Sequence, residues 1–489
     1  MNRRDLLKIA PLALAAAASR ASSQMVMLPG APGQSAAQQS TIDSSDITLR
    51  IAPVTVELAP DRILSTIGYN GTAPGPVIRM KEGKPVTINV INETDTPELV
   101  HWHGFLIPSD VDGAEEEGTP FVPPQQAGKP GTRTYKFTPT PAGSRWYHSH
   151  AMAMSDLRKG TYTGQFGFVY IEPASNPGNY DQELFLALRD WEPFFTTQMV
   201  DMDENLDPNA PQPEKPSVLN TAPNGLEVTS TTYSVNDKAL GAGEPIRVTQ
   251  GQRVLFHFLN ASAIENRLIS LGGHKFQVIA LDGNPVPNPA LVETLAIGAG
   301  ERVCAIVEMN NPGNWILGEP TDLIRNAGLG IMVEYANQHK QPQWIKPSTL
   351  LWDYTLFANK AAATPSTAQN IDMIFEKVPR GSGKFNTFTV NGKQSLHDNE
   401  FVLHQGQRYR LTFHNRTDDG HPLHLHRHQW ELVDHNGKPC SGLIKDVLVV
   451  PMYGRSAVEF VANQPGLTLF HCHIQAHMDF GFKALFRYA

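Results

Sequence analysis

The chain has 489 residues, which is too many for one ordinary domain and enough for about three. Its 39 glycines and 38 prolines favour short elements joined by turns, and its net charge of −8 is modest for this length. No basic stripe indicates a nucleic-acid partner, and no long run of one charge indicates a disordered tail.

The N-terminus has the pattern of an export signal. The twin arginines Arg3 and Arg4 precede an apolar run over residues 9–18, and the small residues Ser19 and Ala21 offer a cleavage point. That run is too short to be a membrane anchor, so we interpret residues 1–21 as a twin-arginine signal peptide rather than as an amphipathic helix. Residues 22–45 are rich in Gln, Ser, Ala and Pro and are expected to be a flexible lead-in. The sequence thus predicts passage through the twin-arginine export machinery to the periplasm or another exported location, and a mature protein without a membrane anchor.

One ten-residue segment occurs three times along the chain. The copies begin at Gly83, Gly251 and Gly406, and each ends nine residues later at Asn92, Asn260 and Asn415. Apolar residues alternate between these ends, which is typical of a half-buried strand that follows a glycine turn. The spacing of the copies is that of domains rather than of solenoid repeats. We therefore predict an all-β chain of three β-sandwich domains, at residues 46–173, 178–337 and 345–489.

Histidine pairs follow the first and third copies at matching distances. The first domain has His101 and His103, followed by His148 and His150; the third has His424 and His426, followed by His471 and His473. In both domains the second pair begins 47 residues after the first. The second domain has Ile269 and Leu271 at the first pair of positions and no histidine around Trp315-Ile316-Leu317. The first and third domains therefore carry matched sets of imidazoles, and the second carries none.

This spacing predicts metal ligands. In a strand, His-x-His places both imidazoles on one face and the intervening residue on the other. A single pair is usually a surface feature, but four pairs in register indicate a metal centre, for which uncharged imidazole is a good ligand. Cys472, between His471 and His473, would face away from both. With His477 and His421 it could form the trigonal His₂Cys site typical of blue copper. Zinc would accept these donors, but it has no redox chemistry; the remaining alternative is an inert buried thiol.

The segments HWHG, HSH, HPLHLH and HCHIQAH, in this order, resemble the four copper-binding signatures of the multicopper oxidases. The resemblance covers the chain from about residue 46 to its end. It implies three cupredoxin-like domains and four copper ions, with one copper in the third domain and a trinuclear cluster between the first and third. It also implies the ligand sets, which are His421, Cys472 and His477 for type 1 copper, His101 and His424 for type 2, His103, His148 and His473 for one type 3 copper, and His150, His426 and His471 for the other. The other eight histidines, His257 among them, are expected to be structural or solvated.

The resemblance suggests roles for three more side chains. Asp112 matches an aspartate that follows the first histidine pair, and it is our candidate proton donor for oxygen reduction. Asp446 matches an aspartate that lies near the type 1 site in relatives, where a substrate-side, ligand-supporting or purely structural role is open. Phe482 occupies the axial position, where phenylalanine cannot coordinate, which favours a high potential. Gln475 and Ala476 stand where many relatives have a second acid, so the second proton route is in doubt.

The resemblance implies an oxidoreductase of the laccase type, which couples one-electron oxidation of phenols or aromatic amines to reduction of dioxygen to water. The alternative is a periplasmic enzyme that oxidises Cu(I) in copper tolerance. Such enzymes have a Met-rich insertion, whereas the 13 methionines here are scattered. The patch at 199–204 is small and could be a copper-entry site, a carboxylate that docks a phenol, or a solvated loop. A cupredoxin without catalytic activity would lack ligands that are complete here. Cys304 and Cys440 could form a bridge, but two buried thiols are favoured.

Overall fold

The computed structural model describes residues 40–44, 46–174, 178–197, 225–338, 340–359 and 367–489. The export signal, most of the expected lead-in and the patch at 199–204 lie outside these residues. No helix in the described ranges is long and apolar enough to cross a membrane.

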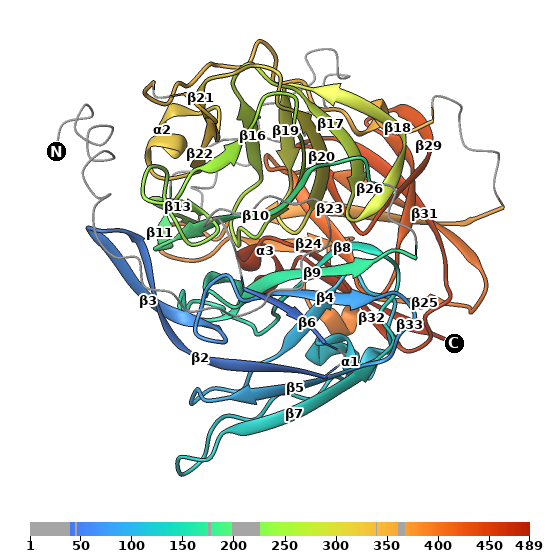
Figure 1. Ribbon diagram of the computed structural model, residues 1–489. Coiled ribbons are helices and arrows are strands. Elements are labelled where there is room, and N and C mark those ends of the chain that lie inside the picture. Colours follow the sequence, from blue (N-terminus) through green and yellow to red (C-terminus); the bar gives the residue numbers. More distant parts are fainter. Residues whose placement is uncertain (1–39, 45, 175–177, 198–224, 339, 360–366) are drawn as a thin grey trace.

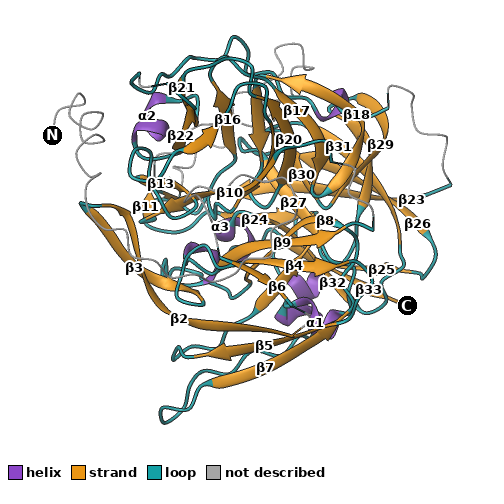
Figure 2. Ribbon diagram, viewed as in Figure 1, coloured by secondary structure: helices purple, strands orange, loops and turns teal. Residues whose placement is uncertain are grey.

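The described chain folds into three successive pairs of β-sheets, coloured blue to cyan, green to yellow, and orange to red in Figure 1. Strands dominate all three, and the few helices are single turns between them (Figure 2). The all-β prediction is confirmed. The short helices are α1 (Ser109–Asp112), α2 (Asp322–Asn326) and α3 (Gln475–Asp479), with 3-10 turns η1 (Glu115–Glu117), η2 (Gly160–Tyr162), η3 (Tyr354–Leu356) and η4 (Leu396–Asp398).

The first pair joins a five-stranded sheet, in the order β1-β4-β9-β8-β6, to a four-stranded sheet, β3-β2-β5-β7. The strands of the first sheet are β1 (Thr41–Asp43), β4 (Val77–Lys81), β9 (Phe166–Glu172), β8 (Gly143–Ser149) and β6 (Val100–His103). Those of the second are β3 (Arg62–Tyr69), β2 (Asp46–Ala59), β5 (Val86–Asn92) and β7 (Gly131–Phe137).

The second pair has a six-stranded sheet, β13-β10-β15-β20-β17-β18, and a five-stranded sheet, β14-β22-β21-β16-β19. The six strands are β13 (Thr232–Val235), β10 (Gln182–Trp191), β15 (Arg253–Asn260), β20 (Arg302–Glu308), β17 (Phe276–Leu281) and β18 (Asn284–Val292). The five are β14 (Ile246–Val248), β22 (Gly330–Tyr335), β21 (Asn314–Gly318), β16 (Arg267–Leu271) and β19 (Thr294–Ile297), and a separate ribbon joins β11 (Phe194–Thr196) to β12 (Glu227–Thr229).

The third pair has a six-stranded sheet, β24-β23-β26-β31-β28-β29, and a five-stranded sheet, β25-β33-β32-β27-β30. The six strands are β24 (Thr387–Val390), β23 (Gln369–Val378), β26 (Arg408–Asn415), β31 (Arg455–Val461), β28 (Trp430–His435) and β29 (Lys438–Lys445). The five are β25 (Glu400–Leu403), β33 (Lys483–Tyr488), β32 (Leu467–Cys472), β27 (His421–Leu425) and β30 (Val447–Val450).

The three repeated segments are the equivalent strands β5, β15 and β26. Each pairs in parallel with the first long strand of its domain and antiparallel with a later one. The glycine that begins each copy has a positive φ, which explains the residue type, since other residues rarely adopt this conformation. The asparagine that ends each copy is buried, and its side-chain amide donates to two or three backbone carbonyls of neighbouring segments. The repeat therefore specifies a glycine turn, a strand and an asparagine whose side chain holds neighbouring backbone segments in place.

One of these strands differs from the expected half-buried pattern. Every residue of β15 except the first is buried, whereas β5 alternates with partly exposed positions. The difference arises because the second face of β15 packs against the first domain, where His257 contacts Ser144 of β8.

The expected lead-in is shorter than the sequence suggested. Residues 41–43 form β1, which pairs in parallel with β4 at the edge of the first sheet. The Val77 amide also donates to the Ser40 carbonyl at 2.8 Å. These backbone hydrogen bonds fix a segment whose composition alone indicated a flexible chain.

Candidate metal centres

The histidine pairs lie on two strand pairs that occupy equivalent places in the first and third domains. In the first domain β6 pairs with β8, and His101 lies opposite His148. In the third, β27 pairs with β32, and His424 lies opposite His471. The equal spacing of 47 residues in the sequence therefore reflects the same strand pairing in two domains. In the second domain Ile269 and Leu271 are part of the apolar core.

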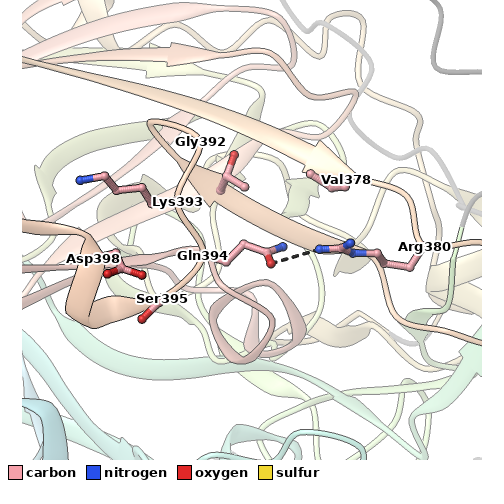
Figure 3. Close-up of a pocket in the computed structure, with 8 residues that line it drawn as sticks. Val378, Arg380, Gly392, Lys393, Gln394, Ser395 and Asp398 are labelled. Atoms are coloured by element: carbon pink, nitrogen blue, oxygen red, sulfur yellow. Dashed lines mark hydrogen bonds between the residues drawn. The ribbon is translucent and has the colours of Figure 1, made fainter.

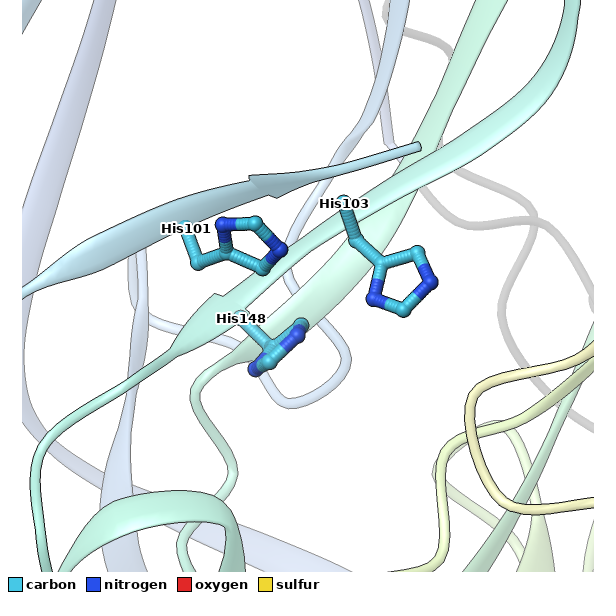
Figure 4. A group of neighbouring side chains, drawn as sticks. All are labelled: His101, His103 and His148. Atoms are coloured by element: carbon cyan, nitrogen blue, oxygen red, sulfur yellow. The ribbon is translucent and has the colours of Figure 1, made fainter. Parts of the chain in front are cut away.

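Eight buried imidazoles meet between the first and third domains. The rings of His101 and His426 stack across this boundary with centroids 3.9 Å apart, and those of His103 and His424 do the same at 3.9 Å. Figure 4 shows His101, His103 and His148 turned toward one another from β6 and β8. The eight residues are His101, His103, His148, His150, His424, His426, His471 and His473.

These imidazoles present lone pairs without protein partners. Ring nitrogens of six of them are buried and make no hydrogen bond, although an unpaired buried polar atom is costly. Burial also lowers the pKa of seven of the eight, to about 3 for His471, so that these rings are uncharged at neutral pH. Metal ions bind uncharged imidazoles through a free ring nitrogen. These rings are uncharged, and their unpaired nitrogens converge on one space, so they can bind a metal cluster. The six residues with orphaned nitrogens are His101, His103, His148, His150, His424 and His473.

The structure brings each expected ligand set together. Ring nitrogens of His150, His426 and His471 lie within 4.8 Å of one another. The ring of His473 lies 5.2 Å from each of those of His103 and His148. The rings of His101 and His424 are 5.8 Å apart. The residues present thus fit a cluster of three metal ions.

A second, smaller cluster joins His421, Cys472 and His477. The Cys472 Sγ atom lies 3.7 Å from Nδ1 of His421 and 3.6 Å from Nδ1 of His477, and the two nitrogens are 3.2 Å apart. All three residues are buried. Cys472 pairs with Leu423 across the ladder, whereas its neighbour His471 pairs with His424. Strand alternation therefore directs the sulfur to one site and the adjacent imidazoles to the other, and the three donors suit copper.

Phe482 lies against this second cluster. Its ring is buried and packs edge-on against the His421 ring at 4.7 Å between centroids. Its backbone amide donates to the His477 carbonyl at 2.9 Å, and its carbonyl accepts from the Cys472 amide at 3.1 Å. Phe482 is thus held beside all three donors and offers no ligand atom of its own.

Asp112, at the end of α1, lies at the cluster of eight histidines. One carboxylate oxygen is 2.9 Å from Nδ1 of His426 and 3.1 Å from Nδ1 of His101, so it contacts imidazoles of both domains. The other oxygen is buried, and the carboxyl of Glu117 hydrogen-bonds to this carboxylate. Gly113 allows this position because a Cβ there would lie 2.0 Å from the Val100 carbonyl oxygen.

The structure places Asp446 beside the eight-histidine cluster rather than beside the His₂Cys site. Its carboxylate accepts from Arg302 at 2.7 and 2.6 Å and lies 3.2 Å from Nε2 of His103. Its backbone carbonyl accepts from Nδ1 of His424 at 2.7 Å. Asp446 is fully buried, so its contacts favour a role in orienting two of the expected ligands and not a position on the substrate side.

Sequence reasoning missed Glu117, which also lies at this cluster. It is buried at the end of η1, accepts from the Leu469 amide at 2.7 Å and lies 3.4 Å from Nδ1 of His426. Burial and the neighbouring Asp112 raise the pKa of its carboxyl well above the usual range. The available signal was weak, since Glu117 is one of three consecutive glutamates, a pattern typical of an exposed loop.

Gln475, which stands where many relatives have a second acid, makes hydrogen bonds between the first and third domains. Its carbonyl accepts from the amide and hydroxyl of Thr161 at 3.0 and 2.7 Å, and its amide donates to Asp479 at 3.0 Å. Burial raises the pKa of Asp479 to about 6. Gln475 thus fastens α3, which carries His477, to the first domain.

A carboxylate and several aromatic rings lie on the outer side of His477. The Glu227 carboxylate, on β12, lies 3.8 Å from Nε2 of His477 and accepts from the Asn386 amide. The Phe388 ring lies 4.1 Å from the His477 ring. Nearby, the rings of Phe480, Phe385 and Phe195 form a chain with centroid distances of 4.3 and 5.1 Å, and Phe195 is 37% exposed. No spacing in the sequence indicated Glu227.

The loop after His150 carries two exposed methionines, Met152 at 40% and Met154 at 43%. The Met154 amide donates to Asp479 of α3 at 2.7 Å, so this loop lies against the helix of His477. The spacing of these methionines in the sequence did not distinguish them from the other eleven.

An open pocket of about 750 Å³ lies elsewhere on the third domain, near β24 and η4. Figure 3 shows Arg380 donating to Gln394 along its wall, at 3.1 Å, with Lys393 and Asp398 nearby. None of the predicted site residues lines this pocket.

Three matches to family models cover most of the chain. Residues 51–176, 194–333 and 364–489 each match a model described as multicopper oxidase. Among curated proteins, Multicopper oxidase MmcO of Mycobacterium tuberculosis is 28% identical, with 96% of this chain and 92% of that protein covered. Laccase-2 of Botryotinia fuckeliana is 26% identical, with 86% and 78% covered.

Solved structures share the fold. A laccase from Botrytis aclada matches with a TM-score of 0.70 at 21% identity, covering 92% of this chain and 88% of that one. A multi-copper oxidase from Pseudomonas thermotolerans matches with a TM-score of 0.64 at 23% identity, covering 92% and 100%. The prediction of three cupredoxin-like domains is confirmed by these likenesses.

Proposed function

Because the chain belongs to the multicopper oxidase family, whose members are copper-dependent oxidoreductases that use oxygen, we propose that it is a laccase-type enzyme with four coppers. In this proposal His421, Cys472 and His477 hold the type 1 copper, and the eight converging histidines hold the other three. When bound, the coppers supply the one-electron chemistry that links an organic reductant to reduction of dioxygen to water. The orphaned ring nitrogens of six of these eight histidines support this assignment.

The proposal that the substrate is a phenol rests on the contact between Glu227 and His477. A phenol must lose a proton when it loses an electron, and a carboxylate 3.8 Å from the imidazole Nε2 can accept that proton. The neighbouring Phe388 and Phe195 rings offer faces on which a small aromatic ring can pack. Cys472, through its peptide bonds to His471 and His473, gives a short bonded route from this side of the molecule to the eight-histidine cluster.

One specific feature supports a second candidate, oxidation of Cu(I). Met152 and Met154 are exposed thioethers on a loop that contacts α3, and thioethers are soft donors that suit Cu(I). Their loop lies against the same helix that holds His477. A cuprous ion bound there would be an alternative reductant.

Steady-state oxidation of a methoxyphenol and of Cu(I) under air, measured side by side, separates the two functions. We expect Glu227→Gln to reduce kcat/KM for the phenol by roughly tenfold or more while leaving hexacyanoferrate(II), which has no proton to lose, much less affected. The Met152→Leu/Met154→Leu double variant should leave phenol oxidation unchanged. Efficient Cu(I) oxidation that this double variant abolishes, combined with feeble phenol oxidation, would contradict the laccase proposal.

Phe482→Met is expected to lower the reduction potential of the type 1 site, because a thioether beside His421 is a weak donor that stabilises Cu(II). A decrease of roughly 100 mV corresponds to about 2 kcal/mol of driving force for the first electron. Phenols that are hard to oxidise should lose more turnover than easily oxidised ones. Redox titration at the blue band measures the shift.

Phe375→Met is the matched control for this substitution. Phe375 packs on Phe482 at 4.7 Å and is equally buried, but no contact joins its ring to His421. An unchanged potential in Phe482→Met, or an equal shift in Phe375→Met, would show that the axial argument is wrong.

We further propose that the N-terminal 21 residues direct export by the twin-arginine route to the periplasm, on the basis of Arg3, Arg4 and the apolar run that follows.

A further inference from the structure

A glutamate, a histidine and a cysteine form a hydrogen-bonded triad between the first and second domains, away from the predicted copper ligands. His257 on β15 lies directly opposite Cys304 on β20 in the antiparallel ladder. Nδ1 of His257 is 3.2 Å from the Cys304 Sγ atom, and Nε2 is 3.1 Å from the Glu183 carboxylate. The first domain completes the group through Ser144, whose Oγ lies 2.6 Å from Nδ1 and 3.5 Å from Sγ.

The surroundings hold this triad rigidly. The Phe185 ring stacks on the His257 ring at 4.4 Å with an 8° angle between planes. Glu183 is itself fixed by an ion pair with Arg79. Both ring nitrogens of His257 thus have fixed partners, which are a carboxylate on one side and, on the other, the Ser144 hydroxyl and the Cys304 sulfur. This is the arrangement in which a base, oriented by a carboxylate, activates a thiol.

The charges favour the ionised form of the thiol. Although burial acts to lower it, the Cys304 sulfur and the Glu183 carboxylate raise the pKa of His257 to about 9. Burial also acts to raise the pKa of Cys304, but His257, Ser144 and Arg302 lower it overall. Cys440, the other free thiol outside the metal centres, shows the opposite shift, because burial raises its pKa to about 12.

We propose that Cys304 is an oxidative modification site, a thiolate that hydrogen peroxide converts to sulfenic acid. Cys304 is 4% exposed as a residue and belongs to a small cluster with the partly exposed Tyr180, Ile279 and Ala280. Hydrogen peroxide is little larger than water, so it needs far less room to reach this sulfur than a bulky substrate would. No activity of the oxidase requires this chemistry, since none of the four residues belongs to a proposed copper ligand set.

The reaction balances with groups that the site contains. The thiolate sulfur attacks one peroxide oxygen, the O–O bond breaks, and the sulfur is oxidised while the peroxide is reduced. The departing hydroxide takes the proton of the His257 imidazolium and leaves as water. Cys304 then carries the S–OH group. Cys440 and Cys472 lie in the third domain and are free thiols, so neither is in place to convert the sulfenic acid to a disulfide within the chain.

The experiment exposes copper-loaded protein to hydrogen peroxide for timed intervals and stops the reaction with catalase. The protein is then unfolded in dimedone, digested and analysed by mass spectrometry. Cys440, which is 1% exposed, is an internal control for burial without activation. We expect Cys304 to be labelled at least about tenfold faster than Cys440.

Three variants test the triad. His257→Asn keeps an amide near the Nδ1 position but carries no charge, and it should slow labelling of Cys304 by about tenfold, with Glu183→Gln in between. Cys304→Ser should keep its oxidase activity and lose the label. Equal labelling of Cys304 and Cys440 in the unmodified protein would overturn the proposal without reference to any variant. Unchanged labelling in His257→Asn would also overturn it. Equal oxidation of both cysteines and of exposed Met152 would indicate non-specific radical damage and would likewise contradict it.

Discussion

Replacing Cys472 by serine is expected to abolish the blue colour and oxidase turnover while the cluster between the domains keeps its metal. The thiolate is the only sulfur donor of the His421, Cys472 and His477 site, and a serine hydroxyl is a poor ligand for copper at neutral pH. The same change removes the sulfur that connects the His₂Cys site, through the backbone of Cys472, to His471 and His473 of the eight-histidine cluster. Metal analysis should give about three coppers per chain instead of about four, and the blue absorption should vanish.

The selectivity of this loss follows from the strand. His471 and His473 flank Cys472 but turn their rings to the opposite face, so the substitution leaves their surroundings unchanged. Cys440→Ser is the matched control, because Cys440 is a buried thiol whose hydrogen bond goes to the Leu432 carbonyl and not to a metal ligand. It should retain colour and turnover. A Cys472→Ser protein that stayed blue, or one that lost all its copper, would contradict the assignment of sulfur to one site and imidazoles to the other.

The sequence predicted the parts of these centres that depend on strand periodicity. His101 and His148, like His424 and His471, are separated by 47 residues because each pair sits on adjacent strands of the same sheet. Alternation alone then predicts that Cys472 faces away from its neighbours. The glycine and asparagine that bound each repeated strand have the same turn and the same loop contacts in all three domains, which is why the repeat was visible.

Residues that reach a site from a loop or from another domain were not predictable in this way. Glu117 touches His426 across 309 residues of chain, and Glu227 touches His477 across the boundary of the second and third domains. Asp446 was expected near the His₂Cys site, yet the turn between β29 and β30 points its carboxylate at His103. Such contacts depend on how the domains pack against one another, and the periodicity of a single strand does not predict that packing.

Asp112→Asn is expected to slow the reaction with dioxygen by about 100-fold, the scale on which a positioned general acid contributes. Reduction of dioxygen to water consumes protons as well as electrons, and Asp112 is buried between the domains against both His101 and His426. Its carboxylate also hydrogen-bonds to the buried carboxyl of Glu117. Asparagine has nearly the same shape and can still accept from the imidazoles, but it cannot deliver a proton.

Separate measurement of the two half-reactions distinguishes a proton donor from a side chain that only positions ligands. In Asp112→Asn, anaerobic bleaching of the blue band by a reductant should keep its rate, whereas recovery of the band on addition of dioxygen should slow and acquire a larger solvent isotope effect. Glu117→Gln is the comparison, because Glu117 reaches His426 but not His101 in the contacts of the described chain. If Asp112→Asn lost copper, or if bleaching and recovery slowed equally, the carboxylate would serve to hold His101 and His426. If the two half-reactions were as fast as in the unmodified protein, protons would reach the cluster by another route, and the buried Glu117 would become the residue to replace next.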